Sequence, residues 1–236
     1  MGHGFSVKAR GKAEADILIY EDVGESWFGG VSAKQFAADI KGLGAVETIN
    51  VRLNSYGGDV FDGLAIYRQL VEHPARVVAH VDGIAASIAS IIAMAGNEIR
   101  IAEAGFLMIH DAWGVAIGNA ADMREVADRL ETVTGSLTDV YVARTKQDRG
   151  AIRDWMQAET WFTAAEAVEH GFADSMVENM RAAARLDPAR HKFRNPPAAL
   201  AAPASPVRPA YEAAAAKIAR LAAQRANQRI KESRGA

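Results

Sequence analysis

The chain has 236 residues, of which 50% are hydrophobic and 24% are charged, and none is cysteine. This composition supplies a sizeable apolar core and excludes wholesale disorder. The lack of cysteine excludes disulfides, a cysteine nucleophile and thiolate metal sites. The longest apolar run, residues 84–96, is shorter than the roughly 18–20 residues of a membrane span, and the N-terminus lacks a secretory signal pattern. We therefore expect a cytoplasmic protein without a membrane partner.

The net charge of −2 conceals two parts of opposite charge. Residues 1–180 carry 15 basic and 26 acidic side chains, a balance of −11, whereas residues 181–236 carry 12 and 3, a balance of +9. Six of the seven prolines also lie after residue 180. We predict a folded domain over residues 1–180, a Pro- and Ala-rich linker over 181–210 and a basic, Ala-rich helical tail over 211–236. The tail either stays solvated, lies on its own domain or binds an acidic partner.

Short apolar runs alternate with amphipathic segments and predict strands and helices in turn. The predicted strands are residues 15–20, 49–53, 76–81, 99–102 and 106–109. The predicted helices are residues 32–43, with Ser32 as N-cap, then 60–70 and 85–95, and turns are predicted at 54–58 and 82–83. This rhythm favours an α/β fold with partly parallel strands, in which loops at the carboxyl ends of strands hold the chemistry.

The segment from residue 119 to about residue 146 predicts one long helix. Its apolar residues step by 3, 4, 3, 4 and 3 positions, which is heptad spacing. These residues are Met123, Val126, Leu130, Val133, Leu137 and Val140. Two interpretations stay open: a core helix of the domain, or a projecting helix that packs against a copy of itself.

Serine and histidine residues beside predicted strands are candidates for nucleophilic catalysis. Ser87 lies where a strand meets a helix, so that helix N-terminal amides can face an oxyanion near its hydroxyl. Ser90, one turn later, is the competing nucleophile. His110 ends the strand 106–109, which suits a general base. Each residue is also typical of ordinary packing, as a small helix-packing serine or a hydrogen-bonded structural histidine.

Acidic residues near position 160 supply a group that can orient a histidine. Thr163 and Glu166 predict a capping box for a helix that ends near Gly171, which accounts for Glu166. Glu159 precedes that cap beside two aromatic residues. A carboxylate that orients an imidazole is one interpretation of it.

Paired glycines, Gly57 and Gly58, end the turn at 54–58 and allow the backbone to approach a substrate closely. Other chemistry is excluded by the motifs. No phosphate-binding loop is present, so ATP hydrolysis is not expected. No metal-ligand spacing is present, and we expect neither a metal, nor a cofactor, nor a specific nucleic-acid partner.

Four segments, in order, resemble the ClpP-type serine peptidases. They are residues 54–67 (NSYGGDVFDGLAIY), 83–96 (GIAASIASIIAMAG), 106–110 (FLMIH) and 161–174 (WFTAAEAVEHGFAD). The resemblance covers about residues 15–180. It implies an α/β, ClpP/crotonase-like fold of repeated β-β-α units with a long protruding handle helix.

The resemblance also implies roles for individual residues. Ser87 matches the family's nucleophile and His110 its general base. The amides of Gly58 and Ile88 match the oxyanion hole, and Gly57 lies in the turn that binds substrate.

The third member of the family's triad is usually Asp, and its position here is Glu159. A glutamate can orient an imidazole with one extra methylene of reach. Asp154, five residues earlier, is the alternative. The helix at 119–146 matches the family's handle helix, which interlocks stacked rings, and this favours a homo-oligomer.

Within the family, residues 159–164 (ETWFTA), the long helix that begins at Gly118 and the basic extension resemble head maturation proteases of tailed phages and prophages. The implied function is a serine endopeptidase that cleaves scaffold or capsid precursor in the host cytoplasm, inside the prohead. One alternative is a Clp proteolytic subunit fed by a separate ATP-dependent AAA+ unfoldase. Another is an inactive crotonase-like or scaffolding protein, against which Ser87 and His110 argue.

Overall fold

The computed structural model describes residues 5–10, 13–24, 30–178 and 193–200. The chain divides into two compact units, Met1–Ala184 and Arg185–Ala236. In the second unit, residues 193–200 include a 3-10 turn at Ala198–Leu200. The predicted tail and most of the predicted linker lie outside the described residues. Among the described helices, none combines the length and apolar character needed to cross a membrane.

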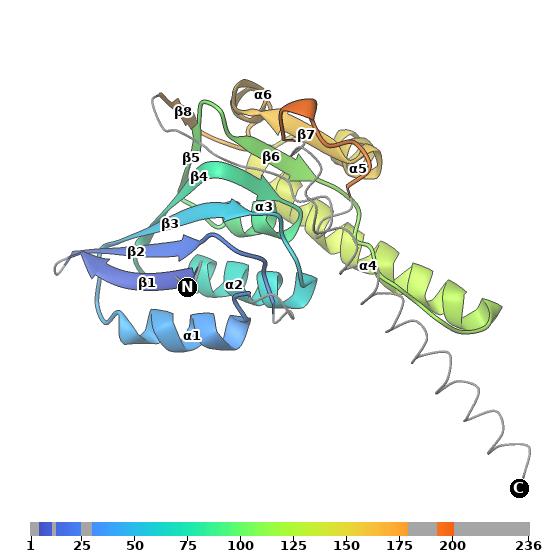
Figure 1. The fold of residues 1–236 in the computed structure, drawn as a ribbon, viewed down its shortest axis with the longest axis horizontal. Coiled ribbons are helices and arrows are strands. Elements are labelled where there is room, and N and C mark those ends of the chain that lie inside the picture. Colours follow the sequence, from blue (N-terminus) through green and yellow to red (C-terminus); the bar gives the residue numbers. More distant parts are fainter. Residues whose placement is uncertain (1–4, 11–12, 25–29, 179–192, 201–236) are drawn as a thin grey trace, which may run out of the picture. The chain divides into compact units, whose positions relative to one another are not determined.

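An eight-stranded sheet forms the centre of the first unit (Figure 1). Its strands are β1 (Phe5–Arg10), β2 (Glu14–Ile19), β3 (Thr48–Ser55), β4 (Arg76–Ala86), β5 (Glu98–Ala102), β6 (Phe106–Ile109), β7 (Thr160–Thr163) and β8 (Ser175–Val177). The neighbours β2, β3, β4, β5 and β8 are parallel, and β1 is antiparallel to β2. The partly parallel α/β fold predicted from the sequence is therefore confirmed.

Six α-helices accompany the sheet in the described part of this unit. They are α1 (Ala33–Gly42), α2 (Val60–Glu72), α3 (Ile88–Ala93), α4 (Ala120–Thr145), α5 (Arg149–Ala158) and α6 (Ala164–Glu169). The alternation along β3 separates the two faces of the sheet, because Ile49, Val51 and Leu53 are fully buried while the residues between them are half-buried. Helices α1, α2 and α3 lie on one side of the sheet in Figure 1, and the core forms between them and the apolar face.

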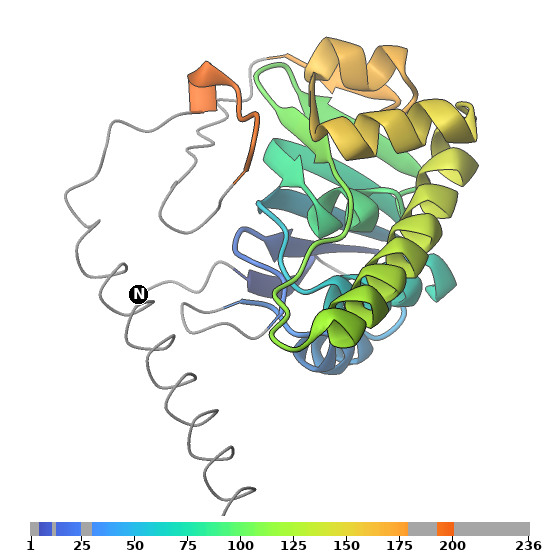
Figure 2. The same ribbon diagram turned by 90° about the vertical axis from the view of Figure 1, so that its right-hand side faces the viewer.

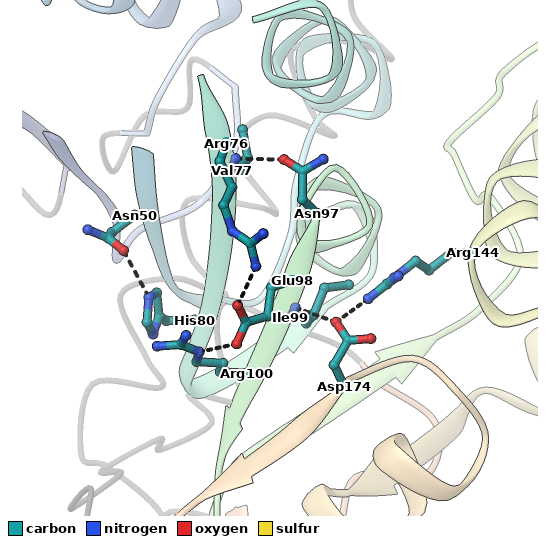
Figure 3. A network of polar contacts seen from close by, with 10 residues as sticks. All are labelled: Asn50, Arg76, Val77, His80, Asn97, Glu98, Ile99, Arg100, Arg144 and Asp174. Carbon is teal, nitrogen blue, oxygen red and sulfur yellow. Dashed lines mark hydrogen bonds and ion pairs between the residues drawn. The ribbon is translucent and has the colours of Figure 1, made fainter. Parts of the chain in front are cut away.

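The polar side chains of the sheet form a network (Figure 3). The Nε2 atom of His80 lies 3.3 Å from Oδ1 of Asn50, and Glu98 accepts from Arg100 at 2.6 Å and from Arg76 at 2.7 Å. Those two hydrogen bonds lower the pKa of Glu98 to about 2, and burial lowers the pKa of His80. These groups pair with one another on the side of the sheet away from the apolar core.

Strand β4 passes through a region in which the sequence predicts a turn at 82–83 and a helix over 85–95. The predicted turn is wrong, and the predicted helix is present but shorter, over Ile88–Ala93. The first half of β4 pairs with β5, and residues 84–86 then pair with the parallel strand β6. The small residues of this segment suit a helix in isolation, but the ladder to β6 extends the strand. Helix α3 accordingly begins only after Ser87.

Helix α4 has two halves in different environments. Asn119 and Asp122 form a capping box at its start. None of residues 120–133 is buried. Burial begins in the second half, at Thr134, Leu137, Thr138, Tyr141 and Thr145. In Figure 1 the first half extends beyond the sheet and its covering helices, and in Figure 2, which looks onto that side, it lies in front of them. The C-terminal half of α4 is therefore part of the core of the domain, as one of the two interpretations expected. The N-terminal half projects from the domain, as the other expected.

The sequence patterns missed four short elements: β1, α5, β7 and β8. Two local predictions are confirmed, since Ser32 accepts from the α1 amide of Gln35 and Thr163 forms a capping box with Glu166. Of the missed elements, α5 and β7 matter most for function, because they flank Glu159.

Candidate active site

Ser87 occupies the junction of β4 and α3 in a strained backbone conformation. Its φ of 56° and ψ of −130° lie in a region that residues with a Cβ rarely adopt. Its amide donates to the carbonyl of Met108 at 3.0 Å, so β6 fixes one side of the junction. The sharp change of direction ends the strand ladder at this serine.

His110 directly follows β6, the parallel neighbour of the second half of β4. Parallel strands bring their carboxyl ends to the same edge of a sheet. His110 Nε2 accordingly lies 2.8 Å from Ser87 Oγ. A neutral imidazole can accept the hydroxyl proton at this distance, so the pair has the geometry of a nucleophile and its base.

Ser90, the competing serine, lies on the opposite side of the same turn. It is fully buried, and its Oγ donates to the carbonyl of Ser87 at 2.6 Å. The same Oγ is 2.7 Å from the hydroxyl of Tyr141 on α4. A hydroxyl enclosed in this way cannot meet a substrate, which leaves Ser87 as the candidate nucleophile.

Glu159 directly precedes β7, as His110 directly follows β6. The last antiparallel pair is Ile109 and Thr160, so His110 and Glu159 lie at the same end of the β6–β7 ladder. Glu159 caps α5 with a φ of 53° and is only 4% exposed. The indole Nε1 of Trp161 donates to its carboxylate at 3.4 Å. A buried acid therefore lies at the end of the ladder where His110 leaves β6.

Two other acids lie close to His110 or Glu159 in the sequence. Asp154, the alternative triad acid, is exposed on α5. Asp111 follows His110 in the chain, but its carboxylate pairs with Arg153 at 3.3 Å. Of these three acids, Glu159 is the buried one, and it lies at the end of the β6–β7 ladder where His110 leaves β6.

Gly57 and Gly58 form the backbone wall beside the Ser87 junction, with φ values of 98° and 145°. A Cβ on Gly57 would lie 2.7 Å from the Ser87 Cβ and 3.2 Å from the nitrogen of Ile88. A Cβ on Gly58 would lie 2.0 Å from the carbonyl oxygen of Val23, whose backbone holds this turn through two hydrogen bonds of 2.8 Å. Only glycines allow the turn to approach this closely.

The amides of Gly58 and Ile88 have no acceptor among the backbone and side-chain groups of the described residues. Ile88 is the first residue of α3, where amides lack intrahelical partners. Two such donors beside a serine hydroxyl suit the oxyanion that forms on a carbonyl under attack. Within the described ranges, no three His, Asp or Glu side chains gather where a metal ion could bind.

Comparison with known proteins agrees with this geometry. The sequence profile of a family described as Clp protease matches residues 6–180. The chain belongs to the Clp protease family. It is 31% identical to the ATP-dependent Clp protease proteolytic subunit 1 of Mycobacterium bovis over 136 residues, which cover 56% of this chain and 68% of that protein. It is 30% identical to the subunit of the same name from Streptomyces avermitilis over 174 residues, which cover 71% and 77%.

Membership of the family makes the chain a ClpP-type serine endopeptidase. It also confirms the ClpP-like fold class expected from the four sequence segments. Sequence patterns indicated Ser87, His110 and the glycine turn as site residues, but they did not indicate Tyr141. The signal that could have found it is spacing, because Tyr141 continues a line of buried residues on α4 that is offset from the heptad residues.

Replacing Glu159 by Gln is expected to lower kcat about 10²- to 10⁴-fold, because an amide cannot hold the imidazole in its reactive tautomer or stabilise its charged form. Asp154→Asn is the matched control, since it makes the same chemical change on an exposed residue of the preceding helix. Its kcat should stay within about twofold of the unmodified protein. Steady-state hydrolysis of a fluorogenic peptide measures both variants. If Asp154→Asn were the impaired one, the orienting role would pass to Asp154.

Proposed function

We propose that the chain cleaves peptide bonds with Ser87 as nucleophile, His110 as general base and Glu159 as the acid that orients the imidazole. The observation that carries the proposal is the 2.8 Å contact between Ser87 Oγ and His110 Nε2. The end of the β6–β7 ladder supports the third assignment, because His110 and Glu159 adjoin its last pair, Ile109 and Thr160.

The proposed reaction follows from these positions. Ser87 Oγ attacks the scissile carbonyl while His110 Nε2 takes its proton. The carbonyl oxygen becomes an oxyanion, which accepts hydrogen bonds from the amides of Gly58 and Ile88. His110 then returns the proton to the leaving amine, and a water activated by the same imidazole releases the acyl group from Ser87. No metal or cofactor takes part.

Ser87→Ala tests the nucleophile. This change should abolish peptide hydrolysis and labelling by a fluorophosphonate, and it should leave the assembly mass unchanged because the Ser87 side chain serves the chemistry. Labelling is located by mass spectrometry of peptides. Ser90→Ala is the matched control for labelling, since a buried hydroxyl should not react. Label on Ser90, or full activity in Ser87→Ala, contradicts the proposal.

We propose further that the protein is a homo-oligomer, with stacked rings formed through a handle surface. We define this surface as the exposed apolar side chains of Trp113, Val115, Ile117 and Met123. Val115 and Ile117 are 85% and 86% exposed, and large exposed apolar side chains that lie together mark interaction sites. A Cβ on Gly114 would lie 3.8 Å from the Leu130 side chain, so this segment runs beside the projecting half of α4.

Introducing Asp at Val115 and Ile117 together should dissociate the assembly, because each carboxylate would have to be buried without a partner. The fold should persist, since both side chains are exposed in the single chain. Thr132→Asp is the control, because it adds a charge at an exposed position of α4 outside the handle surface. Light scattering reports the mass. An unchanged mass in the double variant would exclude this surface from the interface.

For the biological role we propose head maturation, the cleavage of scaffold or capsid precursor inside a prohead. The +9 charge after residue 180, against −11 before it, supports a tail that tethers the protease to an acidic partner. A second candidate is the proteolytic subunit of an ATP-dependent Clp protease that works with an AAA+ unfoldase. The names of the Mycobacterium bovis and Streptomyces avermitilis relatives favour this second role.

Truncation after residue 180 separates the two roles. For a prohead protease, the shortened chain should hydrolyse a short peptide at the full rate, while its copy number in assembled heads should fall severalfold because the tether is lost. Quantitative mass spectrometry of purified heads gives the copy number. A requirement for an AAA+ unfoldase and ATP to degrade a folded protein would instead establish the Clp role.

A further inference from the structure

A buried pair of hydroxyl groups lies behind the candidate nucleophile. Ser90 on α3 is fully buried and Tyr141 on α4 is 1% exposed, and their oxygens are 2.7 Å apart. The carbonyl of Ser87 accepts from this pair, through Ser90 Oγ at 2.6 Å and also through the Ser90 amide at 3.0 Å. The mechanism proposed above makes no use of either hydroxyl.

The direction of these hydrogen bonds follows from counting protons. A carbonyl oxygen can only accept, so Ser90 donates its single hydroxyl proton to Ser87. Ser90 can then only accept from Tyr141, which must be the donor. Burial raises the pKa of the Tyr141 phenol, so the phenol keeps this proton across the working pH range. The result is a directed chain from Tyr141 through Ser90 to the Ser87 carbonyl, and each bond in such a chain strengthens the next.

The carbonyl that ends this chain belongs to the peptide unit between Ser87 and Ile88. The unit is planar and trans, so its C=O and N–H point to opposite sides. The buried side holds the carbonyl, and the other side presents the Ile88 amide toward the space beside Gly57. A hydrogen bond to the carbonyl therefore fixes the direction of the amide and polarises it as a donor.

We infer that Ser90 and Tyr141 are positioning residues for the oxyanion hole, which they act on through the Ser87–Ile88 peptide. The inference rests on the proposed function, because it assigns a task to the Ile88 amide. The same contact holds the strained turn at Ser87, whose own amide is fixed by Met108 on the other side. Loss of the hydroxyl chain lets this peptide rotate, and the donor then no longer meets the oxyanion.

Tyr141→Phe and Ser90→Ala test the inference. The first variant keeps the ring that packs edge-on against Phe172 at 5.8 Å, and the second removes one oxygen from a small side chain. Because removal of an oxyanion donor lowers kcat about 10²- to 10³-fold, misalignment of one should lower kcat about tenfold and leave KM within about twofold. The affinity for a peptide boronate, whose tetrahedral adduct uses the same donors, should fall by the same factor as kcat.

Thr138→Val is the matched control. It also removes a fully buried hydroxyl from α4, one turn before Tyr141, but that hydroxyl donates to the carbonyl of Thr134 in its own helix at 2.7 Å and contacts Sδ of Met156 on α5 at 3.4 Å. Its kcat and boronate affinity should not change. The double variant of Ser90 and Tyr141 should be no slower than Ser90→Ala alone, because both residues belong to one chain.

Three results distinguish a positioning role from a packing effect and from failure of the proposed function. Unchanged kcat and boronate affinity in both variants, with Ser87→Ala inactive, would overturn the positioning role and leave the proposed function intact. An equal loss in Thr138→Val would also overturn it, since the effect would then be one of packing. If Ser87 did not react with a fluorophosphonate in the unmodified protein, the proposed function itself would be contradicted.

Discussion

The strained backbone of Ser87 is the constraint on which the surrounding structure depends. A residue with a Cβ in such a conformation costs about 1–3 kcal/mol, a large share of the roughly 5–15 kcal/mol that stabilises a domain. Four neighbours hold it in place: the carbonyl of Met108, the hydroxyl of Ser90, the bare Cα of Gly57 and, through Ile88, Gly63 of α2. A Cβ on Gly63 would lie 2.1 Å from the Ile88 side chain, so this glycine lets α2 pack directly against the start of α3.

The topology explains why so few residues suffice to build the site. Strand β4 pairs first with β5 and then with β6, so the sheet divides at the point where β4 leaves its first partner. Ser87 directly follows the second half of β4 and His110 directly follows β6, which places both side chains at one edge. β7 then returns antiparallel to β6 and brings Glu159 to the same level. Each candidate residue thus directly follows or precedes a strand whose register is fixed by a ladder.

Local signals in the sequence predicted much of this arrangement, and long-range pairing accounts for the rest. The Ser32 cap, the period of α2 and the Thr163 capping box are properties of short segments, and they were predicted correctly. The extension of β4 depends on β6, a partner about twenty residues away, so its Ala-rich sequence misleads. Ser90 is excluded as the nucleophile because its side chain is buried. The burial of a single serine depends on tertiary packing, so no local sequence pattern predicts it. For Tyr141 the heptad pattern misleads too, because only Leu137 of the six heptad residues is fully buried.

Backbone strain at the site is concentrated at Ser87. Among the described residues other than glycine, positive φ occurs at Ser87, Lys146 and Glu159. Lys146 and Glu159 cap α4 and α5 in the left-handed region, which is an ordinary conformation for the end of a helix. Ser87, with a ψ of −130°, lies outside that region and precedes a helix. Glycine would relax this position at the loss of the hydroxyl that contacts His110, so stability and chemistry favour different residues there. The histidine itself follows a regular strand, and the strain falls on the residue whose hydroxyl must reach it.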